Sequence, residues 1–221
     1  MISIKNLNKY YDYKRVNQTH ALKDVSLTIE DGELTAIVGS SGAGKSTLLH
    51  ILAGIDDFQS GTVKVGDKEL DTMGPMALAR YRNRTIGIVL QDFGLIEGVS
   101  IMENVMLPLR LGNPMSHGKK KERVMKALTT VGLSDMAKKG VHKLSGGQRQ
   151  RVAIARAIVN DPDYIFADEP TGALDSETGK QIMELFRDLN KKGKTIVIVT
   201  HDQEIAGACD RIVTVKDGRI K

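Results

Sequence analysis

The amino-acid sequence predicts an α/β fold with a mainly parallel core sheet, an N-terminal antiparallel β portion and an inserted helical subdomain. Three observations predict it. The first third of the chain reads as short strands, the pattern from about 75 to 160 is mainly helical, and apolar strands alternate with helices after 160. Such strand–loop–helix units are typical of a parallel sheet covered by helices. We expect one domain over 1–221, with its core at about 1–91 and 161–221 and the helical subdomain at about 92–160.

The expected N-terminal strands have apolar residues near period two, as half-buried strands do. They lie at 2–7, 21–29, 33–38 and 61–70. The Asp31-Gly32 pair predicts the turn between the second and the third, and Gly66-Asp67 predicts that the fourth segment is itself a hairpin.

The later segments carry helix-end signals and buried-strand patterns. A helix is expected from Pro75, because proline suits a first helical turn, and another over 119–132, which ends at a glycine. Apolar runs predict buried strands at 163–168 and 195–200, and 211–220 reads as a closing hairpin. The helix expected over 176–193 has an apolar face made of Ile182, Leu185, Phe186 and Leu189.

The composition is that of an ordinary soluble globular protein, with 41% hydrophobic and 27% charged residues. No apolar run is long enough to span a bilayer, and the first residues lack the hydrophobic region of a signal peptide. We therefore expect the chain to remain in the cytosol unless a partner holds it elsewhere. The single cysteine, Cys209, excludes an intramolecular disulfide.

The charge does not indicate a nucleic-acid partner. The net charge of +5 is modest, and the lysine cluster at 118–123 opens a helical pattern, where it is expected to be a solvated face. Aromatic residues make up 4% of the chain and tryptophan is absent, so a surface that stacks on bases is not expected.

The stretch GSSGAGKST, residues 39–47, predicts a nucleotide site. It follows an apolar strand and opens an apolar helix, which is the context that the pattern G-x-x-x-x-G-K-[ST] requires. Its glycines allow backbone N–H groups to wrap phosphates, Lys45 can reach the terminal phosphates, and the Ser46 hydroxyl can ligate Mg²⁺. The expected phosphate-binding residues are Gly39, Ser40, Ser41, Gly42, Ala43, Gly44, Lys45, Ser46 and Thr47.

Two adjacent acids end the buried strand of YIFADEP. Asp168 is expected to hold Mg²⁺ beside the phosphate loop, as strand-end acids do at such sites. Glu169 projects differently and is a candidate general base that polarises the attacking water. The alternative for Glu169 is a solvated loop acid.

Two further polar residues follow apolar strands. His201 comes directly after TIVIVT, at the strand end where doubly wound sheets bind ligands, and could contact the γ-phosphate. Gln91 follows IGIVL, where its amide could ligate Mg²⁺ or water. A lone glutamine after a strand is also a common polar loop residue, and periodicity does not decide between the two.

A second glycine-rich stretch, LSGGQRQR, occupies residues 144–151. Ser145 and Gln148 have the S-x-x-Q spacing of a capping box before a helix. Gly146 and Gly147 are not needed for capping and weaken a helix start, so they indicate a close approach to the backbone. A second anion site is consistent with this pattern.

These motifs, with GALD after ADEPT, occur in the order found in the ATPase subunits of ABC transporters, which the chain resembles over nearly its whole length. The resemblance implies the ABC type of P-loop NTPase, with catalytic roles for Glu169, His201, Gln91 and Lys45. It implies an ATP-dependent head-to-tail homodimer that sandwiches two ATP with Mg²⁺. It also implies that Asp175 lies at the dimer interface. The stretch Ser145, Gly146, Gly147 and Gln148 would contact the nucleotide of the partner subunit.

The resemblance also implies an aromatic residue that stacks on adenine, which is Tyr11 or the adjacent Tyr10. It implies an integral membrane permease subunit as partner and a peripheral position on the cytoplasmic face of the membrane. Residues that follow Gln91 would dock that subunit or form a local core: Phe93, Leu95, Ile96, Val99, Ile101 and Met102.

Within the superfamily the chain looks most similar to the bacterial branch of lipoprotein-releasing, macrolide-exporting, antimicrobial-peptide-resistance and cell-division ATPases. The implied function is an ATP-hydrolysing transporter subunit for export, extraction of lipoproteins or peptides, or mechanotransmission. The alternatives are a regulatory ATPase that drives a cell-wall or signalling complex and a soluble ABC-type ATPase.

Overall fold

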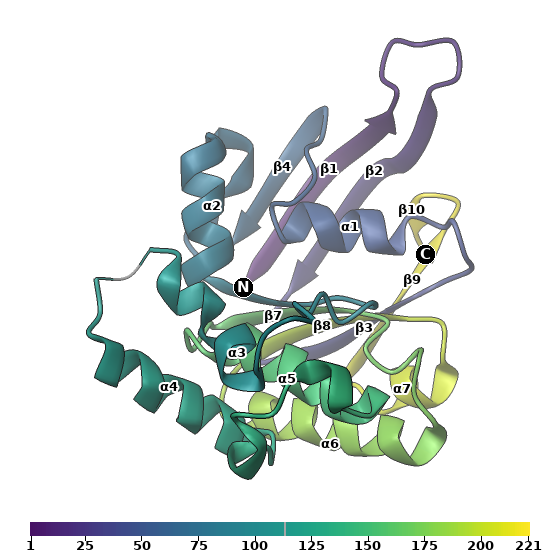
Figure 1. Ribbon diagram of the computed structural model, residues 1–221. Coiled ribbons are helices and arrows are strands. Elements are labelled where there is room, and N and C mark those ends of the chain that lie inside the picture. The colour runs from purple at the N-terminus through teal and green to yellow at the C-terminus, as the bar shows by residue number, and fades with distance from the viewer. Residues whose placement is uncertain (113) are drawn as a thin grey trace.

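The computed structural model describes residues 1–112 and 114–221 and contains two sheets. The first has four antiparallel strands in the order β2-β1-β4-β5 (Figure 1). This sheet confirms the predicted antiparallel N-terminal portion, including the hairpin that turns at Gly66-Asp67. Its strands are β1 (Ile2–Tyr11), β2 (Thr19–Ile29), β4 (Ser60–Val65) and β5 (Lys68–Glu69).

The second sheet has six strands in the order β10-β9-β3-β8-β7-β6, all parallel except for the edge strand β10. The turn at Asp31-Gly32 leads from the first sheet into this one, because β2 pairs with β1 whereas β3 pairs with β8 and β9. The apolar runs are buried along their whole length in β3, β7 and β8, as predicted. The strands are β3 (Leu34–Val38), β6 (Ile86–Val89), β7 (Tyr164–Asp168), β8 (Thr195–Thr200), β9 (Arg211–Lys216) and β10 (Arg219–Ile220).

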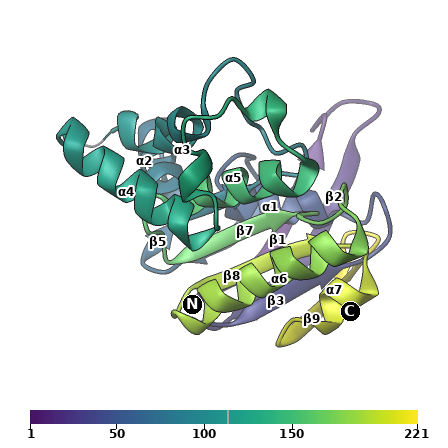
Figure 2. The ribbon, with the colours of Figure 1, turned by 60° about the horizontal axis from the view of Figure 1, so that its bottom comes forward.

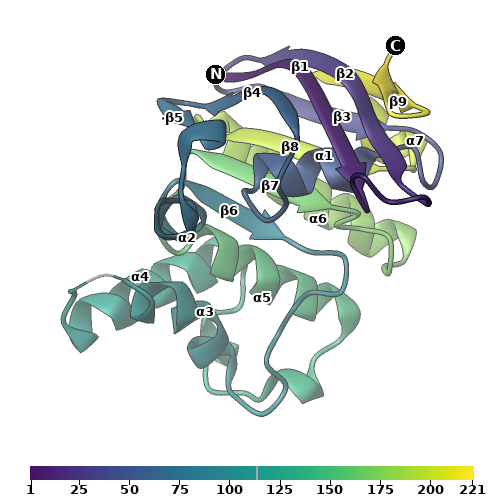
Figure 3. The ribbon, with the colours of Figure 1, turned by 90° about the horizontal axis from the view of Figure 1, so that it is seen from above.

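Helix α1 (Lys45–Leu52) lies between the two sheets (Figures 1 and 3). Its apolar side chains, among them Leu48, Leu49 and Ile51, belong to a core that they share with β1, β2, β4, β7 and β8. A short loop joins the carboxyl end of β3 to the start of this helix. Because the helix is buried against both sheets, the direction of its amino end is fixed.

The opposite face of the six-stranded sheet is covered by α5 (Gly146–Ile158) and α6 (Ser176–Lys191), which lie side by side in Figure 2. The short helix α7 (Gln203–Gly207) packs against β3, β8 and β9. The predicted face of α6 is confirmed, since Ile182 and Phe186 have no exposed surface and Leu185 and Leu189 have 7% or less.

Of the remaining helices, α2 (Pro75–Arg84) packs on β6, whereas α3 (Ile101–Arg110) and α4 (His117–Thr130) pack with each other and with α5. Helix α2 begins at the predicted proline, and α4 starts before the predicted 119, because the Ser116 side chain caps it by accepting from the Lys119 N–H. With α3 and α5, α4 forms the helical group of the predicted segment (Figure 1). Helix α5 also packs on β6, so the division into subdomains stays a prediction. Single 3₁₀ turns occur at η1 (Leu70–Thr72), η2 (Ser134–Met136) and η3 (Val141–Lys143). Over the described ranges, no helix has the length and apolarity needed to cross a membrane.

Substitution of Phe186 by alanine tests the packing of α6 on the sheet. The ring is fully buried in the core between α6 and β8, so the change leaves a cavity that neighbours fill only in part. We expect Phe186→Ala to lower the free energy of unfolding by about 3–5 kcal/mol in urea denaturation. The exposed Glu184 of the same helix provides the control, and Glu184→Ala should change the stability by less than about 0.5 kcal/mol.

Candidate functional site

The phosphate loop joins β3 to α1 and is seated against a strand of each sheet, β9 and β2. A Cβ atom at Gly39 would lie 2.2 Å from the Val215 carbonyl oxygen, and one at Gly44 would lie 2.7 Å from that of Ala21. Gly44 also has a φ of 104°, which L side chains rarely adopt. Glycine is therefore required at both positions by contacts within the protein, besides any need to leave room for a ligand.

Lys45 is 8% exposed and lies along the inside of the loop. Its ammonium group donates to the carbonyl oxygens of Gly39 at 2.9 Å and Ser40 at 3.0 Å. The positive charge is thus held at the amino end of α1, where backbone N–H groups also favour anions.

Asp168 lies beneath the loop, at the end of β7. The Ser46 hydroxyl donates to its Oδ1 at 3.0 Å, and His50 Nε2 lies 3.7 Å from its Oδ2. Burial raises the pKa of Asp168, against the lowering effects of the Ser46 hydrogen bond and of His50. A buried carboxylate beside a hydroxyl is the kind of oxygen-donor set that Mg²⁺ prefers, so these residues fit the predicted cation.

Glu169 has a left-handed backbone, with φ at 44°, which is uncommon for a non-glycine residue. Its N–H donates to the Val199 carbonyl oxygen at 2.9 Å, which holds this conformation against β8. Its side chain is only 12% exposed, and its Oε1 lies 2.8 Å from His201 Nδ1. The alternative of a solvated loop acid is therefore wrong for this side chain.

A pocket of about 830 Å³ brings most of the predicted residues together at the carboxyl ends of β3, β7 and β8. Gly39, Ser40 and Ala43 belong to the loop but do not line this pocket, and Asp168 lies behind Ser46. The predicted residues that line it are Tyr11, Ser41, Gly42, Gly44, Lys45, Ser46, Thr47, Gln91, Glu169 and His201.

The pocket also has a wall that sequence reasoning missed. It is built from the start of β2 and the turn between β9 and β10, which are tied together because the Lys23 N–H donates to the Gly218 carbonyl oxygen at 2.8 Å. The Gly218 N–H in turn donates to Ala43 of the phosphate loop at 3.0 Å. The Asp217-Gly218 turn was visible in the sequence, but nothing there related it to the loop. The missed lining residues are Thr19, His20, Ala21, Lys23, Asp217 and Gly218.

The two candidate aromatic residues at the end of β1 have different surroundings. Tyr10 stacks on His20, with ring centroids 3.9 Å apart and an angle of 16° between the planes, and it does not line the pocket. Tyr11 lines the pocket and is 39% exposed, and its hydroxyl donates to Asp56 Oδ2 at 2.7 Å. These contacts favour Tyr11 over Tyr10 as the stacking residue.

The second glycine-rich stretch forms the predicted capping box at the start of α5. The Ser145 hydroxyl accepts from the Gln148 N–H at 3.3 Å, and Gln148 Oε1 accepts from the Ser145 N–H at 3.2 Å. Cβ atoms at Gly146 and Gly147 would lie 3.3 Å from Leu174 Cδ2 and 2.4 Å from Thr178 Cγ2. The close approach that these glycines indicated is thus made by the protein's own loop and α6. None of the four residues lines the 830 Å³ pocket.

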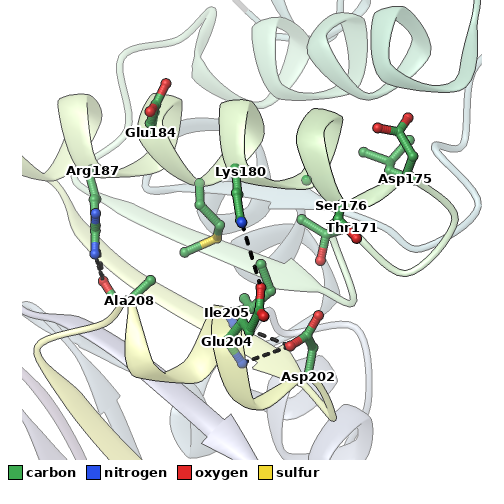
Figure 4. Close-up of a pocket in the computed structure, with 13 residues that line it drawn as sticks. Thr171, Asp175, Ser176, Lys180, Glu184, Arg187, Asp202, Glu204, Ile205 and Ala208 are labelled. Atoms are coloured by element: carbon green, nitrogen blue, oxygen red, sulfur yellow. Dashed lines mark hydrogen bonds and ion pairs between the residues drawn. The ribbon is translucent and has the colours of Figure 1, made fainter.

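Asp175 also lies away from that pocket. It caps α6 by accepting from the Thr178 N–H at 2.9 Å and hydroxyl at 2.7 Å, and the N–H bond lowers its pKa. Its side chain stands at one end of a groove of about 380 Å³ between α6 and α7 (Figure 4). Within a single chain, Asp175 and residues 145–148 therefore lie outside the pocket that the phosphate loop lines.

Three of the six apolar residues after Gln91 pack in the local core. Ile101 has no exposed surface, and Leu95 and Met102 pack against the same core, whereas Ile96 is 48% exposed. The docking interpretation is wrong for the buried Ile101, because a residue without exposed surface offers nothing to a partner.

The family model described as "ABC transporter" matches residues 22–172. The chain belongs to the ABC transporter family. The matched region contains the phosphate loop, residues 145–148, Asp168 and Glu169, and the chain is an ABC transporter ATP-binding domain.

Curated relatives in the ABC transporter family include proteins of two lengths. An uncharacterized ABC transporter ATP-binding protein of Thermotoga maritima is 47% identical over 96% of this chain and 90% of its own length. The macrolide export ATP-binding/permease protein MacB of Aggregatibacter actinomycetemcomitans is 43% identical over the whole chain. The chain spans only 34% of that relative's length.

Solved ABC cassettes confirm the fold class. The dimeric structure of MJ0796, described as a bacterial ABC transporter cassette, is 41% identical in sequence and has a TM-score of 0.91. The match covers 100% of this chain and 97% of that chain. A second dimeric structure of MJ0796, in a post-hydrolysis state bound to ADP and Pi, has a TM-score of 0.91 and 40% identity over the same shares of the two chains.

Alanine at Gly147 tests the contact between α5 and α6 in this ABC domain. The new Cβ would lie 2.4 Å from Thr178 Cγ2, so we expect Gly147→Ala to lower the free energy of unfolding by about 1–3 kcal/mol. Thr178→Ser removes that methyl group and keeps the hydroxyl that Asp175 accepts from. The double variant should recover most of the loss in denaturation experiments, and no recovery would contradict the contact.

Proposed function

We propose that this chain is the ATP-hydrolysing subunit of a bacterial transporter, that it closes as a head-to-tail dimer around two ATP, and that it drives a membrane-embedded partner. The observation that carries the proposal is the division of the site. Lys45, Glu169 and His201 meet in one pocket, whereas residues 145–148 and Asp175 lie elsewhere on the same chain. A second copy would supply the missing half, and the description of MJ0796 as a dimer supports this arrangement.

In this proposal the phosphate loop holds the triphosphate of the substrate. The loop residues 39–47 offer backbone N–H groups at the amino end of α1, and Lys45 adds a charge. Ser46 Oγ and Asp168 Oδ1, which lie 3.0 Å apart, would hold Mg²⁺ together with the Gln91 amide. When bound, Mg²⁺ neutralises charge on the phosphate oxygens.

Glu169 is proposed as the general base. It would accept a proton from the water that attacks the γ-phosphate, for which a mostly buried carboxylate at the rim of the pocket is suited. His201 Nδ1 lies 2.8 Å from Glu169 Oε1, so the imidazole can orient the carboxylate. The exposed part of the His201 ring would contact the γ-phosphate. The strained backbone of Glu169 supports a functional role, because such conformations cluster at active sites.

The partner copy would complete each site. Ser145, Gly146, Gly147 and Gln148, at the exposed start of α5, would contact the γ-phosphate held by the other copy. Asp175, at the start of α6, would lie between the two sites and link them. The contact of Gly147 with Thr178 joins these two elements, so residues 145–148 and Asp175 would move as one unit.

A membrane partner would dock in a groove of about 240 Å³ beside β6, which would hold the chain on the cytoplasmic face of the membrane. The groove is lined mainly by apolar groups, including Ile55, Leu90 and Pro108. It also contains Asn83 and Asn160, whose Oδ1 atoms are buried and have no hydrogen-bond partner among the described residues. These two oxygens have almost no exposed surface, so the apolar lining is what favours an occupant, namely one with an apolar face of its own.

Glu169→Gln tests the proposed chemistry. Loss of the base should reduce the rate of ATP hydrolysis by about 10²–10⁴-fold while ATP still binds, and the variant should accumulate as a dimer with ATP in size-exclusion chromatography. Lys45→Ala should instead weaken ATP binding and give no dimer. Glu184→Gln, on the exposed side of α6, is the matched control and should behave like the wild type. Hydrolysis at the native rate by Glu169→Gln would refute the assignment of the base.

Introduction of a charge into the groove tests the docking of the membrane partner. Ile55 is 51% exposed and lines the groove, so Ile55→Glu should reduce co-purification with the permease subunit that the wild type retains from membranes, while ATP binding persists. Ile212 is similarly exposed, at 48%, but lies on β9 outside the groove, so Ile212→Glu is the control. Equal retention of the partner by both variants would exclude this groove as the docking site.

A further inference from the structure

We infer that Lys9 and Asp56 are positioning residues, which hold the Tyr11 ring as a prebuilt platform for the base of the nucleotide. The inference deepens the proposed function and rests on its claim that the 830 Å³ pocket binds ATP. Neither Lys9 nor Asp56 lines that pocket, so both would act through Tyr11.

The Tyr11 ring is held at its hydroxyl and on one face. Lys9 and Tyr11 are two residues apart on β1, and side chains at that spacing point to the same side of a strand. The Lys9 ammonium lies 4.7 Å from the centroid of the Tyr11 ring, as in a cation–π contact. Asp56 uses both oxygens, because its Oδ1 accepts from Lys9 at 2.6 Å and its Oδ2 accepts from the Tyr11 hydroxyl at 2.7 Å.

The burial of the charged Lys9 beside Tyr11 is not needed for the packing of strand β1. Lys9 is 3% exposed, and burial of a lysine is costly unless acids pair with it, as Asp56 and Asp57 do at 2.6 Å. Burial lowers the pKa of Lys9, but the bonds from the two acids outweigh it and raise the pKa overall. The cation therefore stays charged, while 39% of Tyr11 remains exposed toward the pocket.

The same network fixes the platform relative to the phosphate loop. The Tyr11 hydroxyl lies 3.2 Å from Thr47 Oγ1, in the first turn of α1. Asp56 follows the other end of α1, where its N–H donates to the His50 carbonyl oxygen at 3.3 Å. One rigid helix thus sets the distance between the phosphate cradle and the aromatic ring. A nucleotide that spans the distance from the phosphate loop to the ring would bind to a ring that is already ordered, so binding would not include the entropic cost of ordering it.

The network predicts which part of the ligand depends on Lys9 and Asp56, namely its base. Stacking on an aromatic ring tolerates any base, because every base has a π-face. Lys9 and Asp56 should therefore strengthen binding of ADP and GDP by the same factor. They should leave a ligand without a base, such as inorganic tripolyphosphate, unaffected.

Calorimetric titration with Mg²⁺·ADP and with Mg²⁺·tripolyphosphate tests the inference on the full chain. Tyr11→Ala should lower ADP affinity by roughly 5- to 150-fold, the range for loss of one base–aromatic stack. Lys9→Met and Asp56→Asn should lower it by about 3- to 10-fold, with tripolyphosphate affinity unchanged. Tyr11→Phe keeps the ring and the Lys9–Asp56 pair, and it should give a smaller loss than Tyr11→Ala.

Lys194→Met is the matched control, because Lys194 is a mostly buried lysine paired with Asp161 at 2.7 Å, away from the pocket. It should leave both affinities at the wild-type values. A double-mutant cycle separates positioning from a general structural role. In the Tyr11→Ala background, Asp56→Asn should cause no further loss of ADP affinity if Asp56 acts through the ring.

Three outcomes would overturn the inference. These are unchanged ADP affinity in Lys9→Met and Asp56→Asn, an equal loss for tripolyphosphate, and a further loss of ADP affinity on top of Tyr11→Ala. Each of them leaves the proposed ATPase intact as long as the wild type binds both ligands. A wild type that binds neither would instead overturn the proposed function and this inference with it.

Discussion

The seating of the phosphate loop against neighbouring backbone is the constraint on which the rest of the structure depends. The loop approaches so closely that Cβ atoms at Gly39 and Gly44 would meet the carbonyl oxygens of Val215 and Ala21. The same Ala21 oxygen would meet a Cβ at Gly218, so the loop, β2 and the last hairpin converge on one point. Helix α1 is then buried between two sheets, and its amino end is aimed into the pocket without freedom to rotate.

From that fixed point the functional groups divide into two sets. Strands β7 and β8 deliver Asp168, Glu169 and His201 to the phosphate loop, because parallel neighbours end at the same edge. The starts of α5 and α6 present residues 145–148 and Asp175 elsewhere, joined to each other where Gly147 meets Thr178. Each set is held together by contacts of its own, and a head-to-tail pair is the arrangement that would bring one set of each copy to the other.

The sequence predicted what depends on local pattern, and it missed what depends on contacts between distant segments. Apolar runs located β7 and β8, and the S-x-x-Q spacing located the capping box of α5, because both signals lie within a few residues. The bond between Tyr11 and Asp56 joins residues 45 positions apart, and no spacing rule relates them. Ile101 was ambiguous for a related reason, since an apolar residue reads the same whether a partner or the protein's own core covers it.

The two proposed interfaces meet at consecutive residues. Gln91 lines the nucleotide pocket, and Leu90, one peptide bond earlier, lines the groove beside β6. Arg156 of α5 donates to the Phe93 carbonyl oxygen at 2.8 Å, which ties the segment after Gln91 to the helix whose first turn contains residues 146–148. A displacement of Gln91 toward a bound cation would therefore pull on Leu90 and on α5 together. Because a packed helix moves as a body, nucleotide binding in one copy would be transmitted to the groove and to the residues offered to the other copy.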